Sequence, residues 1–326
     1  MKACYLGVDV GSVSTNIVLV DEDNKVRYKT YLRTQGKPIE VLQKGLKEMK
    51  NQISQFAIKG VGTTGSGRHL ASIILGADIV KNEITSHAIA AINYIDGVRT
   101  ILEIGGQDSK IIIIRDGIVT DFAMNTVCAA GTGSFLDRQA ARLGIEIQEF
   151  GNMALKSQNP VRIAGRCAVF AESDMIHKQQ LGHNQEDIIS GLCEALVRNY
   201  LSNVGKGRDI QGKVIFQGGV AANVGIKKAF EKALNLEVIV PDNYDVMGAI
   251  GAAILARNEV KQKGYTAFRG IDISDIDYTV KGFECSDCSN MCEVIEISSE
   301  SSLIARYGDK CGKWTNSLKL HDQNLA

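Results

Sequence analysis

The sequence has little proline, no long apolar run and no excess of either charge. Three prolines stand against 33 glycines in 326 residues, which favours tight turns and close backbone approaches over proline-rich linkers. No apolar run approaches the ~20 residues that a membrane span needs. Hydrophobic residues make up 44% and charged residues 23%, as is usual for a globular protein. A membrane protein and a disordered protein are therefore both excluded.

The charge balance and the cysteine content exclude further classes of protein. Lys and Arg total 37, as do Asp and Glu, so the basic surplus typical of nucleic-acid binding is absent. Eight cysteines are too few for a disulfide scaffold at this length. The amino terminus, MKACYLGVDVG, begins a strand pattern instead of the apolar stretch of a signal peptide. We expect a cytoplasmic protein that binds neither nucleic acid nor membrane.

Two meanders of strand-length apolar runs organise the chain. An acidic residue ends the first strand of each meander and a glycine turn follows, in Asp9-Val10-Gly11 and in Glu103-Ile104-Gly105-Gly106. This repetition predicts an α/β protein with two homologous lobes. The expected strands are Ala3–Val10, Thr15–Val20 and Val26–Leu32, then Thr100–Ile104, Lys110–Arg115 and Ile118–Asn125. We expect lobe I to comprise residues 1–97 plus 247–264, lobe II residues 98–246, and a small Cys-rich C-terminal module residues 265–326.

The turns after these strands have the composition of phosphate loops. In GVDVGSVSTN a strand delivers Asp9, and the turn offers backbone N–H groups and several hydroxyls, which suit phosphates and a water-bridged Mg²⁺. Such a turn taken alone could equally close a hairpin. A second acidic-Gly-Gly turn, EIGGQDSK, predicts two facing loops that clamp one triphosphate. In FQGGVAANVG, Gly-Gly ends a strand before a helix, where a nucleoside can approach the backbone.

In this order the three loops resemble those of the acetate/sugar kinase, Hsp70 and actin superfamily, whose two ribonuclease-H-like lobes hold ATP in a cleft. The resemblance spans roughly residues 3 to 262 and implies ATP/ADP with Mg²⁺ as ligands; no Walker sequence GxxxxGK[ST] occurs. By analogy with other nucleotide hydrolases, Gln107 is the candidate to orient the attacking water, the alternative being a hydrogen bond within its turn. The implied catalytic residues are Asp9, Glu103 and Gln107, and the implied nucleotide-binding residues are Gly11, Ser12, Val13, Ser14, Thr15, Gly105, Gly106, Gly131, Gly133, Gly218, Gly219 and Asn223.

Two cysteines stand near the starts of helical patterns, Cys128 in NTVCAAGTGSF and Cys167 in GRCAVFAE. A helix start lowers a thiol pKa and favours an anionic centre, although either cysteine taken singly is more typical of a core residue. Two thiolates make half of the four-ligand set of an iron–sulfur cluster. A twofold homodimer would complete the set, with Cys128 and Cys167 of each subunit on one [4Fe–4S] cluster.

The strings CAAGTG and GRCAVFAES resemble those of the activators of 2-hydroxyacyl-CoA dehydratases and of related ATP-dependent reductive activases, including those of benzoyl-CoA reductases and double-cubane cluster proteins. The resemblance implies a homodimer with one bridging cluster, which passes a low-potential electron to a partner iron–sulfur reductase or dehydratase as ATP is hydrolysed. Flavodoxin or ferredoxin is the implied donor. Asn16, where dehydratase activators often carry Lys, and Glu103, where Asp is more usual, look more like the double-cubane or longer activase type.

Four further cysteines lie close together near the carboxyl end. Cys285-x2-Cys288-x3-Cys292, with Cys311 later, forms a four-thiol set that core packing does not explain. Zn²⁺ and a second iron–sulfur cluster both suit such ligands, and free or redox-active thiols are the alternative.

Two other functions suit the phosphate loops. A small-molecule kinase acting on amino sugars would need an Asp base and a sugar pocket but no iron. A non-catalytic ATP-binding sensor or chaperone-like module would change its peptide surface with nucleotide exchange.

Overall fold

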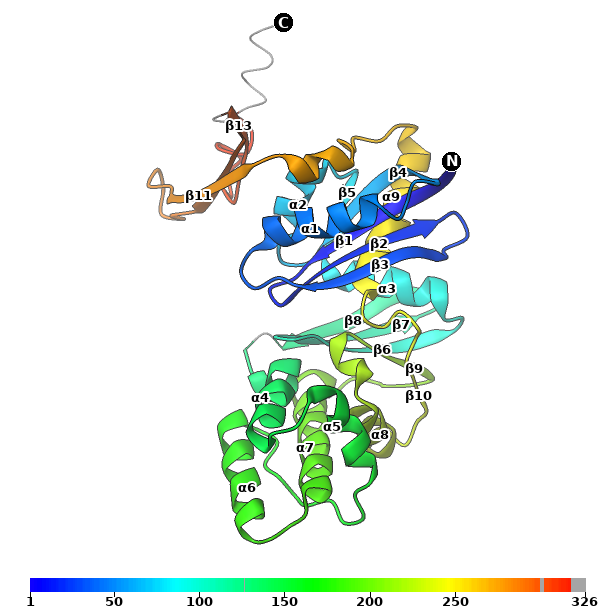
Figure 1. Ribbon diagram of the computed structural model, residues 1–326, viewed down its shortest axis with the longest axis vertical. Coiled ribbons are helices and arrows are strands. Elements are labelled where there is room, and N and C mark those ends of the chain that lie inside the picture. The colour runs from blue at the N-terminus through cyan, green and yellow to red at the C-terminus, as the bar shows by residue number, and fades with distance from the viewer. Residues whose placement is uncertain (126, 300–301, 318–326) are drawn as a thin grey trace, which may run out of the picture.

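The protein, in a computed structural model, consists of two stacked α/β lobes and a small C-terminal sheet (Figure 1). The structure describes residues 1–125, 127–299 and 302–317, so the last nine positions of the expected C-terminal module, 318–326, lie outside the described residues. Within the described ranges no helix has both the length and the apolarity to cross a membrane.

Lobe I is built on a five-stranded sheet in the order β3-β2-β1-β4-β5. The first three strands form the expected antiparallel meander, and β4 and β5 join it in parallel. Helices α1 and α2 bury Leu42, Leu46 and Leu70 against one face. The elements are β1 (Lys2–Val10), β2 (Ser14–Asp21), β3 (Val26–Arg33), α1 (Pro38–Lys50), β4 (Phe56–Thr64), α2 (Arg68–Leu75), β5 (Ile79–Val80) and α3 (Glu83–Tyr94).

Lobe II repeats this topology with a sheet in the order β10-β9-β6-β7-β8. Again an antiparallel three-strand meander, β6 to β8, is extended by two parallel strands. The repeated meander in the sequence therefore corresponds to a repeated sheet. The elements are β6 (Val98–Ile104), β7 (Ser109–Arg115), β8 (Ile118–Asn125), β9 (Lys213–Gln217), α8 (Val224–Leu234) and β10 (Val238–Ile239).

Between β8 and β9 lobe II carries a helical subdomain, which packs on the outer face of its sheet (Figure 1). Helix α7 is its centre, and its Leu192, Leu196 and Tyr200 are completely buried. The helix α5 was not expected from the sequence. The helices are α4 (Gly133–Leu143), α5 (Ile147–Leu155), α6 (Ala168–Gln180) and α7 (Gln185–Tyr200), followed by a π-helical turn at Leu201–Gly205.

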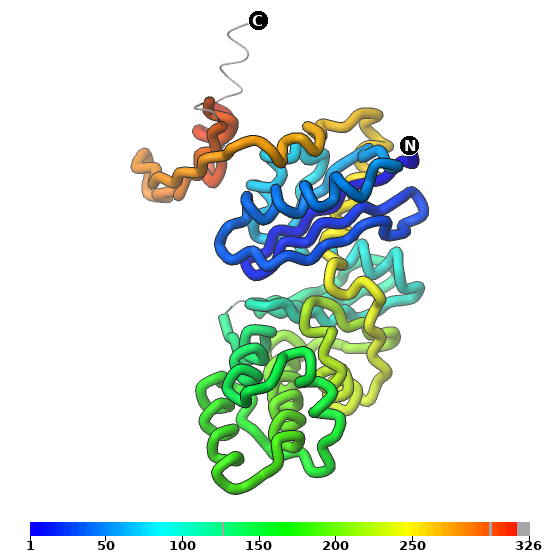
Figure 2. Tube along the Cα trace, in the orientation of Figure 1, coloured from blue at the N-terminus to red at the C-terminus, as the bar shows by residue number. Residues whose placement is uncertain are grey.

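Helix α9 (Met247–Lys263) returns the chain from lobe II to lobe I, where Figure 2 shows it crossing behind the first sheet. Its small residues allow the close packing that its Gly- and Ala-rich face predicts: a β-carbon on Gly7 or Gly62 of the sheet would collide with the helix backbone at Ala249 or Ala252. Together with α3 it fills the space between the two sheets, where residues of both lobes share one core cluster, Val18 and Ile112 among them.

After α9 a 3₁₀ turn at Ile271–Asp275 leads to a three-stranded antiparallel sheet, β11 (Tyr278–Glu284), β12 (Glu293–Ser299) and β13 (Ser302–Tyr307). The sequence predicted a boundary near Gly264, and α9 ends there. It did not predict these strands, because their Ser-, Asp- and Cys-rich composition lacks a strong apolar alternation.

Candidate functional site

The glycine turns that follow β1 and β6 meet between the lobes. A β-carbon on Gly106 would lie 2.8 Å from the side chain of Val13, so nothing larger than glycine fits there without movement. The second turn is closed by a hydrogen bond from Gly105 N to Asp108 O at 3.0 Å. Two facing turns are the arrangement that can hold one triphosphate from both sides.

A cavity of about 120 Å³ lies between these turns and adjoins a larger one of about 520 Å³; both are lined by Gly105, Gly106 and Gly219. Small-molecule sites usually measure roughly 300–1,000 Å³, so the larger part has the size for a nucleoside. The expected site residues that line one or both cavities are Asp9, Gly11, Ser12, Val13, Ser14, Glu103, Gly105, Gly106, Gln107, Gly133, Gly218, Gly219 and Asn223.

Two expected nucleotide-binding residues lie beside the cleft instead of lining it. The hydroxyl of Thr15 is buried 3.0 Å from that of Thr34, which in turn donates to Gly11 O at 2.9 Å. Thr15 therefore holds the first turn in place through Thr34 and does not face the cavity. Gly131 packs against α7, since a β-carbon there would lie 2.8 Å from Asn199 Oδ1.

The residue with the most ionic contacts in the cleft, Lys110, was not identified from the sequence. Its side chain is 2% exposed, and its ammonium lies 2.7 Å from Glu83, 2.8 Å from Asp108 and 3.1 Å from Glu103. Strand pairing sets part of this geometry, because Glu103 on β6 is directly opposite Lys110 on β7. A lysine within a strand of otherwise buried residues was the sequence signal that could have revealed it.

Burial dominates the ionisation of the carboxyls in this cleft. It raises the pKa of Asp9 to about 7, with a further contribution from Glu83, and the pKa of Glu103 to about 8, against the opposing effect of Lys110. For Lys110 itself burial lowers the pKa, but Glu103, Glu83 and Asp108 outweigh it and the pKa is raised. Lys110 is therefore charged at all physiological pH values.

The donor set suits Mg²⁺. Glu83 and Asp108 interact electrostatically with both Asp9 and Glu103, and Lys110 opposes their effect on each of these two carboxyls. A hard divalent cation with oxygen ligands would offset this negative charge and favour the ionised carboxylates against the effect of burial. Asp9 is the residue that the first turn presents for this role, since the turn and the carboxylate line the same cavity.

The larger cavity is lined by the turn that follows β9, which includes Gly219 and Asn223, and by Gly133 at the start of α4. Gly218 adopts φ of +88°, and a β-carbon there would lie 2.7 Å from Glu103 Oε1, so this position requires glycine. Asn223 caps α8 by accepting a hydrogen bond from Ile226 N at 3.0 Å. Its Nδ2 is buried and has no partner in the described part of the chain, so a donor remains available beside the cavity.

Cys128 and Cys167 are neighbours at the surface of lobe II. Cys128 Sγ lies 3.9 Å from the carbonyl oxygen of Arg166, and both thiols are partly exposed. Each cysteine directly precedes a helical turn: Cys128 the 3₁₀ turn Ala129–Gly131, and Cys167 the helix α6. Asn199 joins their segments, since its Nδ2 donates to Gly165 O at 2.6 Å and lies 3.9 Å from Cys128 Sγ.

Large apolar side chains are exposed beside both cysteines. Val127 is 95% exposed, and Val169 and Phe170 at the start of α6 are each 68% exposed. Exposed apolar groups that lie together in this way are typical of interaction surfaces. No three His, Cys, Asp or Glu side chains of the described ranges are arranged to bind a metal ion.

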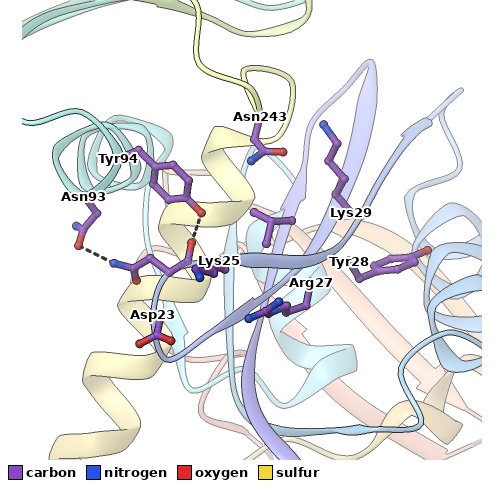
Figure 3. Close-up of a pocket in the computed structure, with 10 residues that line it drawn as sticks. Asp23, Lys25, Arg27, Tyr28, Lys29, Asn93, Tyr94 and Asn243 are labelled. Atoms are coloured by element: carbon purple, nitrogen blue, oxygen red, sulfur yellow. Dashed lines mark hydrogen bonds between the residues drawn. The ribbon is translucent and has the colours of Figure 1, made fainter.

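A separate cavity of about 590 Å³ lies at the turn between β2 and β3 (Figure 3). Lys25, Lys29, Tyr94 and Asn243 are among the residues around it, and none of the predicted site residues lines it. Tyr94 donates a hydrogen bond to Asn24 O across this cavity. It is therefore distinct from the cleft that holds the phosphate turns.

Comparison with known proteins agrees with this geometry. Residues 6–256 match the BadF/BadG/BcrA/BcrD ATPase family. The chain belongs to this family. The matched residues include the glycine turns after β1, β6 and β9 and the two neighbouring cysteines, and they end before the C-terminal sheet.

Relatives of this ATPase include activators of dehydratases. The chain is 36% identical over 261 residues to the 2-hydroxyisocaproyl-CoA dehydratase activator of Clostridioides difficile, covering 79% of this chain and 96% of that protein. It is 33% identical over 265 residues to the (R)-2-hydroxyglutaryl-CoA dehydratase activating ATPase of Acidaminococcus fermentans, covering 78% and 98%. The crystallised Clostridium difficile activator with bound ADPNP superposes with a TM-score of 0.73 at 34% identity, over 80% of this chain and 97% of that one.

Proposed function

We propose that this ATPase is a homodimeric activase that couples ATP hydrolysis to the delivery of a low-potential electron to a partner iron–sulfur reductase or dehydratase. The electron centre is a [4Fe–4S] cluster held by Cys128 and Cys167 of both subunits. When bound, this cluster supplies a one-electron carrier, and Mg²⁺ supplies positive charge beside the phosphates.

One observation carries the proposal: the second phosphate turn is hydrogen-bonded to the segment that bears Cys128. Gly133 N donates to Gly105 O at 2.9 Å, and Ser134 N donates to Gly106 O at 2.9 Å. Cys128 lies only five residues before Gly133, and a 3₁₀ turn fills the interval. A shift of the second turn on loss of the γ-phosphate would therefore pull on the cysteine segment.

Other contacts make this segment a rigid connection. Asn125 accepts hydrogen bonds from Val127 N and Cys128 N and donates to Cys128 O. Asn199 then ties the same region to the residues before Cys167. Because Asn199 of α7 contacts both cysteine segments, they would move together instead of separately.

The residues of the cleft have different roles in the proposed hydrolysis. The backbone amides of the two turns bind the phosphates, Asp9 holds the magnesium shell, and Lys110 keeps Glu103 and Asp108 in position beside the second turn. Gln107 lines the cavity between the turns, from where its amide can orient the attacking water. The free Nδ2 of Asn223 is a candidate to bind the nucleoside.

The homodimer is supported by the surface around the cysteines. Two thiols per chain leave half of a four-thiolate set unfilled, and the apolar side chains of Val127, Val169 and Phe170 surround them in solvent. A twofold axis through this patch would bury these side chains and complete the ligand set. Flavodoxin or ferredoxin is the proposed donor to this centre.

The activase that we propose is of the double-cubane or longer type. Support comes from Asn16 and Glu103 and from the residues beyond the family match: the activator relatives are covered almost whole, yet about a fifth of this chain extends past them.

Anaerobic iron and sulfide analysis tests the proposal. We expect four irons per two chains in the reconstituted protein, and loss of iron in both Cys128→Ser and Cys167→Ser with unchanged ATP binding. Cys193→Ala, which alters a completely buried thiol in α7, is the matched control and should retain the iron. Full iron in either serine variant would contradict the ligand assignment.

A further inference from the structure

Four cysteines of the C-terminal sheet, Cys285, Cys288, Cys292 and Cys311, have no part in the proposed activase. Strand pairing aligns Glu284 at the end of β11 with Glu293 at the start of β12. Cys285 and Cys292 are therefore the next opposing pair, and Cys285 N donates to Cys292 O at 2.8 Å. Cys288 lies in the loop between them, where its carbonyl accepts a hydrogen bond from Met291 N at 3.2 Å.

The fourth cysteine reaches the same end of the sheet from the third strand. Tyr307 of β13 pairs with Ile295 of β12, so the chain leaves β13 beside the start of β12. Gly308 there packs against the backbone of Glu293. Cys311 follows three residues later, and an ion pair between Lys313 and Asp287 ties its segment to the loop of Cys288.

The C-terminal sheet has only a small core of its own. Beyond Gly264 the buried apolar side chains in the described residues are Ile273, Cys285, Val294 and Ile297. Ile273 and Ile297 belong to the core cluster of lobe I, which leaves two for the sheet itself. Modules this small usually depend on disulfides or a structural metal.

We propose that Cys285, Cys288, Cys292 and Cys311 bind one Zn²⁺ ion in a closed Cys₄ site that holds the ends of the three strands together. Four thiolates with no open position are the ligand set of structural zinc. Binding releases the thiol protons to solvent and replaces the weak contacts that two thiols now make, Cys285 Sγ with Asp287 at 3.4 Å and Cys311 Sγ with Asp309 at 3.9 Å. No three of these thiols are arranged around a common point in the described residues, so zinc binding requires their side chains to rotate toward one another from backbone positions at one end of the sheet.

The location indicates a structural role instead of electron transfer. The segment that leads into the sheet is bound to lobe I, where Lys50 pairs with Asp272 at 2.7 Å and Gln43 donates to Ile276 O at 2.6 Å. Ile297 of β12 belongs to the core cluster of lobe I. Helix α6, which follows Cys167, lies at the opposite end of the molecule (Figure 1). A redox-inert ion here would fix the module on lobe I without touching the electron path.

Metal analysis of the full-length protein tests this site separately from the proposed cluster. We expect one zinc per chain, retained in the double variant Cys128→Ser/Cys167→Ser, which should lose only iron. The double variant Cys285→Ser/Cys311→Ser should lose the zinc, and Cys4→Ala, a buried thiol of β1, should keep it. Iron in place of zinc, or zinc unchanged in Cys285→Ser/Cys311→Ser, would overturn the proposal.

A labelling experiment gives an answer even where a variant fails to fold. In the native wild-type protein, alkylation should spare all four cysteines, and a chelator should make them reactive together with release of one zinc. Alkylation of these thiols before the chelator is added, or a Cys285–Cys292 disulfide in the purified protein, would equally overturn the zinc site.

Discussion

Replacing Lys110 by methionine tests the buried charge network at the centre of the cleft. The substitution keeps the length of the side chain and removes the one ammonium that Glu83, Asp108 and Glu103 share within 3.1 Å. Since Lys110 is 2% exposed, water cannot replace it. The three carboxyls then lose their common counter-ion in a site where burial already raises the pKa of Glu103 to about 8.

The expected loss of stability follows from the burial of the network. Removing one partner of a buried ion pair costs about 3–5 kcal/mol, because a charge is left uncompensated. The Lys110→Met variant should therefore unfold at a lower urea concentration than the wild type. The carboxyls can recover part of the lost stability by taking up protons, so the difference from the wild type should be larger at pH 8 than at pH 6. Mg²⁺ should restore some of the lost stability, since it supplies positive charge to the same carboxylates.

Urea unfolding followed by far-UV circular dichroism measures the effect. Lys37→Met is the matched control, because Lys37 pairs with Glu40 at 2.9 Å on the surface, where both side chains are more than half exposed, and such pairs contribute little. The double variant Lys110→Met/Glu103→Gln should recover part of the loss. If Lys110→Met unfolds at the same urea concentration as Lys37→Met, the network does not stabilise the cleft.

Three further substitutions test the site. Gln107→Ala should lower kcat for ATP hydrolysis at least tenfold and change nucleotide affinity little; an equal loss in both would show that Gln107 binds nucleotide instead of orienting water. Glu103→Gln should gain stability over wild type as the pH rises from about 4.5 to 8 without Mg²⁺, by at most about 1.4 kcal/mol per pH unit, because only the wild type must keep a proton on a carboxyl whose pKa is raised to about 8; a difference that does not vary with pH would contradict the buried ionisation. Gly106→Ala should weaken ATP binding, since its β-carbon would lie 2.8 Å from Val13, and Val13→Ala in the same chain should restore binding; no rescue would mean that the two turns do not meet.

The repeated pattern of the sequence predicted the sheets well. Alternation and glycine turns indicated the two meanders, and the first strands of these meanders end at Val10 and Ile104, one residue beyond Asp9 and Glu103. Helix α5 was missed, since Gly151 interrupts its apolar pattern. The structure gives the reason for this glycine: a β-carbon there would lie 2.7 Å from Asn223 Oδ1, so tight packing against α8 outweighs helix propensity.

The cleft was predictable in its turns but not in its charges. Loop residues such as Ser12 and Gly105 could be predicted from their neighbours in the sequence. Lys110 could not be predicted in this way, because a lysine is normally a surface residue. Its partner Glu83 also comes from a helix that is distant in the sequence. Only the pairing of β6 with β7 and the position of α3 between the lobes bring these charges together.

The most direct test of the coupling between cleft and cysteines is the rate at which a chelator removes iron from the anaerobic dimer with different nucleotides bound. We predict that the rate differs severalfold between ADP and a non-hydrolysable ATP analogue. The difference should shrink when Gly133→Pro removes the hydrogen bond from Gly133 N to Gly105 O. Equal rates with both nucleotides in the wild-type protein would contradict the account.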